Sequence, residues 1–149
     1  MTMQALVRSM LESDIAEVAR LCGDLDYPSS EEDVARRYAA IRAFPDNEIW
    51  VAERESRVVG WAHGHGVHLL EAESCVEIGG IVVDPAFQGL GIGRLLLAAC
   101  EQWAQERGYP RIRLRSGQQR LDAHAFYRHI GYQQKNTGIT FAIDLPRTA

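Results

Sequence analysis

A glycine-rich turn between a predicted strand and a predicted helix is the part of this sequence with the clearest chemical meaning. It consists of Gln88, Gly89, Leu90, Gly91, Ile92 and Gly93, and Arg94 follows directly. Glycine lets the backbone turn sharply and approach a bulky group closely. The first N–H groups of a helix have no partner within it and carry partial positive charge, so they attract phosphate. The turn therefore predicts an anion site, with a plain tight turn as the alternative.

Two familiar phosphate-binding motifs do not fit this turn. A P-loop ends in Gly-Lys-Ser or Gly-Lys-Thr, whereas this turn ends in Gly93-Arg94-Leu95. A dinucleotide fingerprint has GxGxxG after the first strand and an acid about 20 residues later. Here the spacing is GxGxG late in the chain, and Arg113 and Arg115 occupy the place of the acid. A nucleotide-binding regulatory domain is therefore disfavoured.

Ionisable side chains interrupt the apolar segments before the turn. Glu77 is the one charged residue of segment 74–83, which is rich in Val and Ile. Burying an unpaired carboxylate is costly, and partial burial raises its pKa towards a range useful for proton transfer. A charge at the rim of the sheet that aids solubility is the alternative. His63 and His65 share one face of a strand and His68 lies just beyond, but spacing fixes no third ligand, so we predict no metal site.

Hydrophobic periodicity and turn residues divide the chain into alternating elements. The expected strands are Ala5–Met10, Ile49–Glu53, Val58–Gly66, Ser74–Val83, Ile112–Arg115 and Thr137–Leu145. The expected helices are Asp14–Leu25, Ser30–Phe44 with Ser29 or Ser30 as its cap, Gly91–Arg107 and Leu121–Ile130. Strand 74–83, helix 91–107 and strand 111–115 form a βαβ unit, so these two strands should be parallel. The fold class is thus mixed α/β, with a largely antiparallel sheet around one parallel pair.

Composition limits the functional classes. The chain of 149 residues is 46% hydrophobic, which suits one globular domain spanning residues 1–149. No apolar run is long enough for a membrane helix, and the net charge of −4 argues against nucleic acid. Three separated cysteines show neither a disulfide framework nor a zinc motif, so a reducing, cytoplasmic setting is expected. Most acids lie in residues 1–84 and most basic residues after them, as would suit an anionic and a cationic ligand at different ends, although chance clustering gives the same asymmetry.

Two segments resemble the acetyl-CoA motifs of the GCN5-related N-acetyltransferase (GNAT) family. Segment 81–97 has the Gln-x-x-Gly-x-Gly signature after a strand that ends in Val-Asp-Pro. Segment 125–132, Ala-Phe-Tyr-Arg-His-Ile-Gly-Tyr, is similar to the second cofactor motif of the family. The resemblance implies the GNAT fold with helices on both faces of the sheet, an acceptor-side half (1–73), an acetyl-CoA-binding core (74–132) and a C-terminal strand (133–149).

The resemblance also implies how acetyl-CoA is held. The pantetheine arm pairs with the backbone near Ile81 and Val83, where the strand splays from 111–115, and an N–H near Val82 is the expected oxyanion donor. The pyrophosphate lies on the glycine turn. Many members have Asn seven residues before the motif tyrosine, where this chain has Arg120, so that contact is not expected.

Two side chains are implied as the catalytic groups. Tyr127 would stabilise the leaving thiolate by a hydrogen bond, because a phenol titrates near 10 and a thiol near ~8.5, which makes full proton transfer uphill. Glu77 would take the ammonium proton through a water. Packing on an amphipathic helix is the alternative for Tyr127, and water or another group is the alternative to Glu77. His124 lies on the same helical face as Tyr127 and either orients it or packs.

The acceptor site is expected beside the connection of the first two helices, which the resemblance places over the acceptor. Asp24, Asp26 and Tyr27 lie there and could hold an alkylammonium by charge and cation–π attraction. A small cationic amine, such as a polyamine, an aminoglycoside-like compound or an amino-acid derivative, is the first choice, and a protein N-terminus or lysine is the second. A non-catalytic acyl-CoA sensor is the rival from another class. Dimers are common in the family, so a homodimer stays open.

Overall fold

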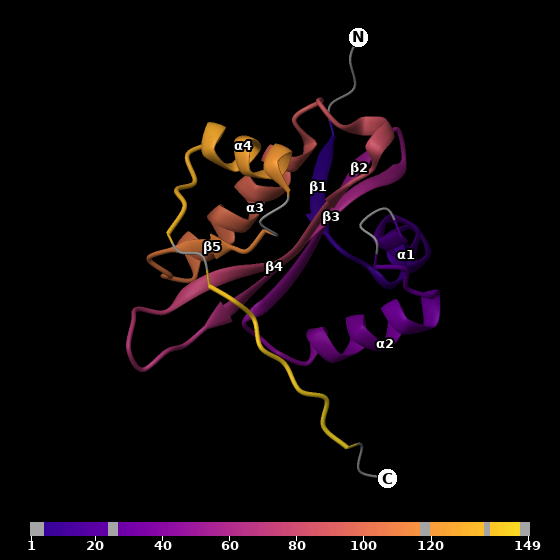
Figure 1. Ribbon diagram of the computed structural model, residues 1–149. Coiled ribbons are helices and arrows are strands. Elements are labelled where there is room, and N and C mark those ends of the chain that lie inside the picture. The colour runs from indigo at the N-terminus through magenta and orange to yellow at the C-terminus, as the bar shows by residue number, and fades with distance from the viewer. Residues whose placement is uncertain (1–4, 24–26, 117–119, 136–137, 147–149) are drawn as a thin grey trace. The chain divides into compact units, whose positions relative to one another are not determined.

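The computed structural model describes residues 5–23, 27–116, 120–135 and 138–146. The chain divides into two compact units, Met1–Arg115 and Ser116–Ala149, each of which is described by itself. The first unit holds the sheet and three of the helices, and the second holds one helix and the C-terminal segment (Figure 1).

A five-stranded sheet forms the first unit, with its strands in chain order from one edge to the other. The strands are β1 (Leu6–Ser9), β2 (Asn47–Arg54), β3 (Arg57–Val67), β4 (Cys75–Val83) and β5 (Ile112–Leu114). All neighbours are antiparallel except β4 and β5, which are parallel as the βαβ pattern predicts. The long helix α3 (Ile92–Glu106) makes the crossover between these two strands. The mixed, largely antiparallel sheet predicted from the sequence is confirmed.

Helices cover both faces of this sheet (Figure 1). On one face, α1 (Ile15–Gly23) and α2 (Glu31–Arg42) pack on Ile49, Val51 and Val82, and on the other face α3 packs near Gly60. Adjacent residues of a strand point to opposite faces, so β2 serves both layers: Val51 belongs to the core under α1 and α2, whereas Trp50 makes an edge-to-face contact with Trp103 of α3.

Short local signals set the ends of the helices. Ser30 caps α2 by accepting a hydrogen bond from the Asp33 N–H, and the Asp33 side chain accepts from the Ser30 N–H; this capping box selects Ser30 from the two caps that the sequence leaves open. Before α1, the 3-10 turn η1 (Glu12–Asp14) is fixed by buried Asp14, which accepts two hydrogen bonds from Arg8 and one from the Leu11 N–H.

The second unit contains α4 (Leu121–His129), which agrees with the predicted helix, and a segment without regular structure. The strand expected over Thr137–Leu145 is not formed in the described residues 138–146, which have neither helix nor strand. The expectation came from alternating apolar residues, but a strand also needs a neighbour to pair its backbone groups. Ile139, Phe141, Ile143 and Leu145 are instead all more than three-quarters exposed. The single domain over 1–149 stays a prediction.

Candidate functional site

The parallel pairing of β4 with β5 is short and ends abruptly. Val76 pairs with Ile112, Glu77 with Arg113 and Ile78 with Leu114, whereas β4 continues to Val83. Beyond Ile78, β4 is paired only with β3 within the part of the chain that the structure describes. On its β5 side, β4 from Gly79 to Val83 therefore has no strand partner among the described residues; we call this side its free edge, and it is where the two strands are expected to splay and leave backbone groups for a ligand.

The hydrogen-bond pattern identifies which backbone groups lie on this free edge. The Asp84 N–H donates to the Val59 carbonyl at 2.8 Å, so Val59 and Asp84 are a hydrogen-bonded pair of the β3–β4 ladder. Two pairs further along this ladder, Trp61 lies opposite Val82. Hydrogen-bonded pairs alternate with non-bonded pairs along an antiparallel ladder, so Val82 turns its N–H towards β3. The free-edge N–H groups are therefore those of Ile81 and Val83 rather than that of Val82.

The glycine turn leads from this edge into α3. Gly89 and Gly91 both have φ of 81°, a left-handed conformation that costs other residues about 1–2 kcal/mol. A Cβ atom at either position would meet nothing within 4 Å, so backbone conformation rather than crowding requires glycine. Gly91 caps α3 without a side-chain hydrogen bond, no acid lies in the first turn of α3, and Arg94 is exposed there. This arrangement suits a phosphate.

Asp84 anchors the turn to the rest of the first unit, a role that the sequence analysis did not assign to it. Its carboxylate accepts hydrogen bonds from the Ala86 N–H at 3.0 Å and from Arg20 of α1 at 3.0 Å. The hydrogen bond from Ala86 lowers the pKa of Asp84, and the bond from Arg20 lowers it further against the effect of burial. These bonds hold η2 (Pro85–Phe87), the first part of the connection from β4 to α3.

A row of polar side chains crosses four neighbouring strands near the splay. The strand pairing places Asn47, His65, Glu77 and Arg113 side by side on β2, β3, β4 and β5. Glu77 lies 3.1 Å from Arg113 Nε through Oε1 and 3.5 Å from His65 Nε2 through Oε2. We call these four residues, together with His63 and Arg115, the polar row.

Glu77 is therefore not the isolated charge that its strand suggests. In addition to Arg113, the Nε atom of Arg115 lies 3.6 Å from its Oε1 atom. Two guanidinium groups compensate one carboxylate, which explains how an apolar strand accommodates Glu77 without leaving it unpaired. The signal in the sequence was the alternation of Arg113 and Arg115 on the strand that runs parallel to 74–83.

Within the polar row, His63 is half-buried. Its Nε2 atom lies 2.8 Å from Asn47 Oδ1, and because a carbonyl oxygen only accepts, Nε2 carries the hydrogen. Nδ1 therefore has a free lone pair, and it faces Gly79, where a Cβ atom would come within 2.8 Å of it. Burial, with a smaller effect of His65, lowers the pKa of His63 to about 4. His63 is thus neutral at pH 7.

The structure describes only part of the predicted acceptor site. Asp24 and Asp26 lie outside the described residues. Tyr27 is 74% exposed, and its N–H donates to the Cys22 carbonyl at 3.4 Å. Its ring is therefore accessible to a ligand, and its role stays a prediction.

Tyr127 belongs to the second unit, so it is described apart from the sheet. Its ring contacts those of Phe126 and Tyr132, with centroids 5.5 and 6.2 Å apart. Burial raises the pKa of Tyr127, against a smaller opposite effect of Arg120. The phenol therefore keeps its proton at neutral pH and can donate a hydrogen bond. His124 lies one helical turn earlier, where its N–H bonds the Arg120 carbonyl at 3.1 Å.

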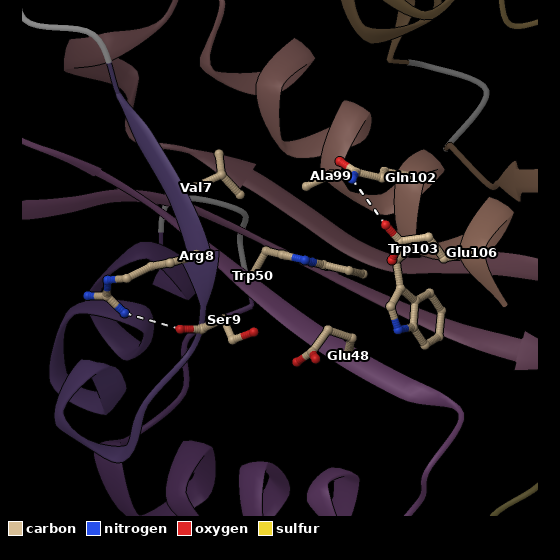
Figure 2. A pocket seen from close by; sticks show the side chains of 9 residues that line it. All are labelled: Val7, Arg8, Ser9, Glu48, Trp50, Ala99, Gln102, Trp103 and Glu106. Carbon is tan, nitrogen blue, oxygen red and sulfur yellow. Dashed lines mark hydrogen bonds between the residues drawn. The ribbon is translucent and has the colours of Figure 1, made fainter.

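A separate groove lies between α3 and the β1 edge of the sheet and includes no residue predicted for the site. It has a volume of about 350 Å³, and Figure 2 shows Trp50, Trp103, Glu48 and Glu106 among its lining residues. Trp50 belongs to the α3 face of the sheet, opposite to the polar row. We therefore do not connect this groove with the candidate site.

The described residues contain neither a cluster of metal ligands nor a helix that could span a membrane. No three His, Cys, Asp or Glu side chains gather as a metal site in residues 5–23, 27–116, 120–135 and 138–146. Over those same ranges, every helix is too short or too polar to cross a bilayer.

Comparison with known proteins agrees with the geometry. Residues 13–132 match the model of the "Acetyltransferase (GNAT) family". An aminoalkylphosphonate N-acetyltransferase of Salmonella typhimurium is 34% identical over 124 residues, which cover 83% of this chain and 78% of that protein. An aminoglycoside N(6')-acetyltransferase of Stenotrophomonas maltophilia is 33% identical over 70 residues, 47% of this chain and 46% of that protein.

Solved structures show the same fold. An aminoglycoside N-acetyltransferase in complex with CoA superposes with a TM-score of 0.86 over 96% of this chain and 97% of its own. The two sequences are only 15% identical, so this likeness concerns the fold alone.

Proposed function

This chain belongs to the GNAT family of acetyltransferases, and we propose that it transfers the acetyl group of acetyl-CoA to the primary amine of a small molecule. That it is an N-acetyltransferase follows from the family and from its curated relatives. The main observation behind the proposed use of acetyl-CoA is that the free edge of β4 leads directly into the glycine turn. The edge suits the pantetheine arm of the cofactor, and the turn suits its pyrophosphate.

The order of these features along the chain gives the direction of the cofactor. The pyrophosphate lies on the free N–H groups at the start of α3, with Arg94 beside it. The pantetheine arm then follows the free edge of β4, first past Val83 and then past Ile81. The acetyl group therefore points towards Glu77, and the Ile81 N–H becomes the donor to the thioester oxygen, in place of the donor expected near Val82.

The reaction needs one new bond and two proton movements. The amine nitrogen attacks the thioester carbonyl carbon, the C–N bond forms and the C–S bond breaks. The acceptor ammonium gives up one proton to become the attacking amine, and the proton that the nitrogen loses after the attack passes through solvent to the CoA thiolate. A hydrogen bond aimed at the oxyanion stabilises the tetrahedral intermediate, and this is the task of the Ile81 N–H.

We assign the removal of the ammonium proton to Glu77 and the stabilisation of the leaving thiolate to Tyr127. Glu77 takes the ammonium proton through a water, although accepting it would weaken its ion pairs with Arg113 and Arg115. Tyr127 stays protonated and donates a hydrogen bond to the leaving thiolate. The half-buried position of its hydroxyl-bearing ring supports this role.

The proposed acceptor is a small amine, as the names of two curated relatives suggest for those proteins. Asp24, Asp26 and Tyr27 would attract its ammonium group before it loses the proton. A cytoplasmic location and a homodimer stay predictions from the sequence.

An amine panel tests this proposal. Purified protein, acetyl-CoA and single amines are mixed, and the free CoA thiol is measured over time. We expect turnover with at least one small amine and slower turnover with lysine peptides. CoA binding by calorimetry without turnover on any amine would identify a sensor and refute the enzyme.

A further inference from the structure

We propose that Arg113 and Arg115 form a subsite for an acidic group on the acceptor, so that the acceptor is an amine that also carries a phosphonate, phosphate or carboxylate. This inference rests on the proposed function and narrows its substrate class. It starts from the positive charge of the polar row, because a polyamine would need a negatively charged site.

The polar row carries an excess of positive charge. Its two guanidinium groups face a single carboxylate, that of Glu77. Asp46, which precedes Asn47 in the chain, is paired with His68 instead, its Oδ2 atom lying 3.6 Å from His68 Nε2. His63 and Asn47 are neutral and bond each other. A second ammonium group would be repelled here, whereas an anion would be attracted.

The Nη groups of Arg113 and Arg115 are hydrogen-bond donors that a bound anion could use. Both approach Glu77 through Nε, at 3.1 Å for Arg113 and 3.6 Å for Arg115. No hydrogen bond recorded between described residues uses the Nη groups of either side chain. Arg115 is 74% exposed along its side chain and Arg113 36%, so these groups are accessible. A planar guanidinium with free Nη groups matches the oxygens of a carboxylate or phosphonate.

The position of the arginines suits a short substrate. Arg113 pairs with Glu77, which lies four residues before Ile81; because Gly79 is an extra residue in a β-bulge, the separation is three regular steps, or roughly 10 Å along the strand. An arginine side chain and an aminoalkyl chain of a few atoms together bridge such a distance. The acid would then rest on the arginines while the amine reaches the thioester beside Ile81. The same geometry gives no anchor to a long polyamine.

Three amines of equal length test the inference: 3-aminopropylphosphonate, 3-amino-1-propanol and 1,3-diaminopropane. At saturating acetyl-CoA, we expect kcat/KM for the phosphonate to exceed that of the other two by about tenfold or more, the effect of one charge-assisted hydrogen-bond pair. Arg113→Gln with Arg115→Gln should bring the ratio of kcat/KM for the phosphonate to that for 3-amino-1-propanol down to about one, mainly through KM of the phosphonate, because both amines share any effect of the change on Glu77. Arg36→Gln on α2, an exposed arginine that pairs with Asp33, is the matched control.

Binding is measured separately, so that failure of this inference and failure of the proposed function can be told apart. Calorimetry of 3-aminopropylphosphonate against the protein saturated with CoA needs no turnover. Tighter binding than 3-amino-1-propanol, lost in the double variant, supports the subsite even if no amine is acetylated. Equal or weaker binding overturns it, even if amines are turned over. Arg115→Gln alone, at the more exposed position, replaces the double variant if that does not fold.

Discussion

At the scale of single residues, the proposed mechanism assigns the reaction to a hydroxyl and a carboxylate in different chemical settings. The phenol of Tyr127 is half-buried and protonated, whereas Glu77 is a carboxylate bracketed by two guanidinium groups. Tyr127 can donate a hydrogen bond to the thiolate because it keeps its proton at neutral pH, whereas Glu77 can accept a proton only by weakening its ion pairs with the two arginines. We therefore expect the loss of Tyr127 to be more damaging than the loss of Glu77.

Tyr127→Phe tests the donor. The change removes one hydroxyl and keeps the ring contacts with Phe126 and Tyr132, so the fold should survive. We expect kcat to fall about 100-fold or more, while CoA affinity in calorimetry changes little. Unchanged kcat in the folded variant, with chemistry shown to be rate-limiting, would remove Tyr127 from the mechanism and leave the cofactor site as proposed.

Glu77→Gln tests the acceptor of the proton. The variant keeps the size of the side chain and removes the charge, so kcat/KM should fall and the acidic limb of its pH profile should flatten. Glu53→Gln is the control, because Glu53 also pairs with an arginine, Arg8, at 3.1 Å on another part of the sheet. An acidic limb that is the same in Glu77→Gln and wild type would assign the proton to water or another group.

His63 predicts a pH dependence of stability. Its pKa is about 4 in the folded protein and 6.5 in the reference state, so between these values the unfolded chain binds a proton that the folded chain does not. Its neutral form contributes stability above pH 6.5, and this contribution is lost as the pH falls towards 4, by no more than about 3 kcal/mol. His63→Gln should therefore lose less stability than wild type over that range in urea titrations. The exposed His68→Gln should follow wild type, and parallel curves for all three proteins would contradict the prediction.

At the scale of elements, we propose that the start of α3 and the free edge of β4 act as one binding surface. The turn between them depends on two glycines with positive φ and on Asp84, which ties it to α1. The same strand that supplies free backbone groups on one edge is held by β3 on the other edge. The cofactor can therefore pair with β4 without unfolding any part of the sheet.

Gly91→Asp tests this surface against a matched variant, Gly108→Asp. Both glycines have φ near 80° and open space where a Cβ atom would lie, so both changes should cost about 1–2 kcal/mol of stability. Only Gly91 lies at the start of α3, where the carboxylate would repel the pyrophosphate. We expect CoA affinity to fall by at least ~2 kcal/mol in Gly91→Asp and to stay near wild type in Gly108→Asp. Equal affinities in calorimetry would place the pyrophosphate elsewhere.

At the scale of the whole molecule, charge is distributed unevenly along the chain. Acids prevail in residues 1–84 and basic residues after them. The proposed acceptor meets both kinds of charge, because Asp24 and Asp26 would attract its ammonium group and the arginines of β5 and its C-terminal end would hold its acid.

The double variant Asp24→Asn and Asp26→Asn should raise KM for the amine and leave KM for acetyl-CoA nearly unchanged. The effect should shrink as salt is added, because exposed charges are screened over ~10 Å at 0.1 M. Steady-state kinetics at low and high salt measure both KM values and the dependence of the amine KM on salt. Glu31→Gln with Glu32→Gln, two exposed acids at the start of α2, is the charge-matched control. An unaltered amine KM would remove Asp24 and Asp26 from the site.

The sequence by itself determined the features that depend on neighbouring residues. The glycine spacing of 88–93 predicted an anion-binding turn. A serine cap at 29 or 30 and the change from strand to helix periodicity predicted most of the elements, because local backbone preferences decide them. Tertiary structure decided what depends on pairing between distant segments. It placed Arg113 on Glu77, turned the Val82 N–H towards β3 and left residues 138–146 without a strand, since a ladder or an ion pair needs a partner that local sequence does not specify.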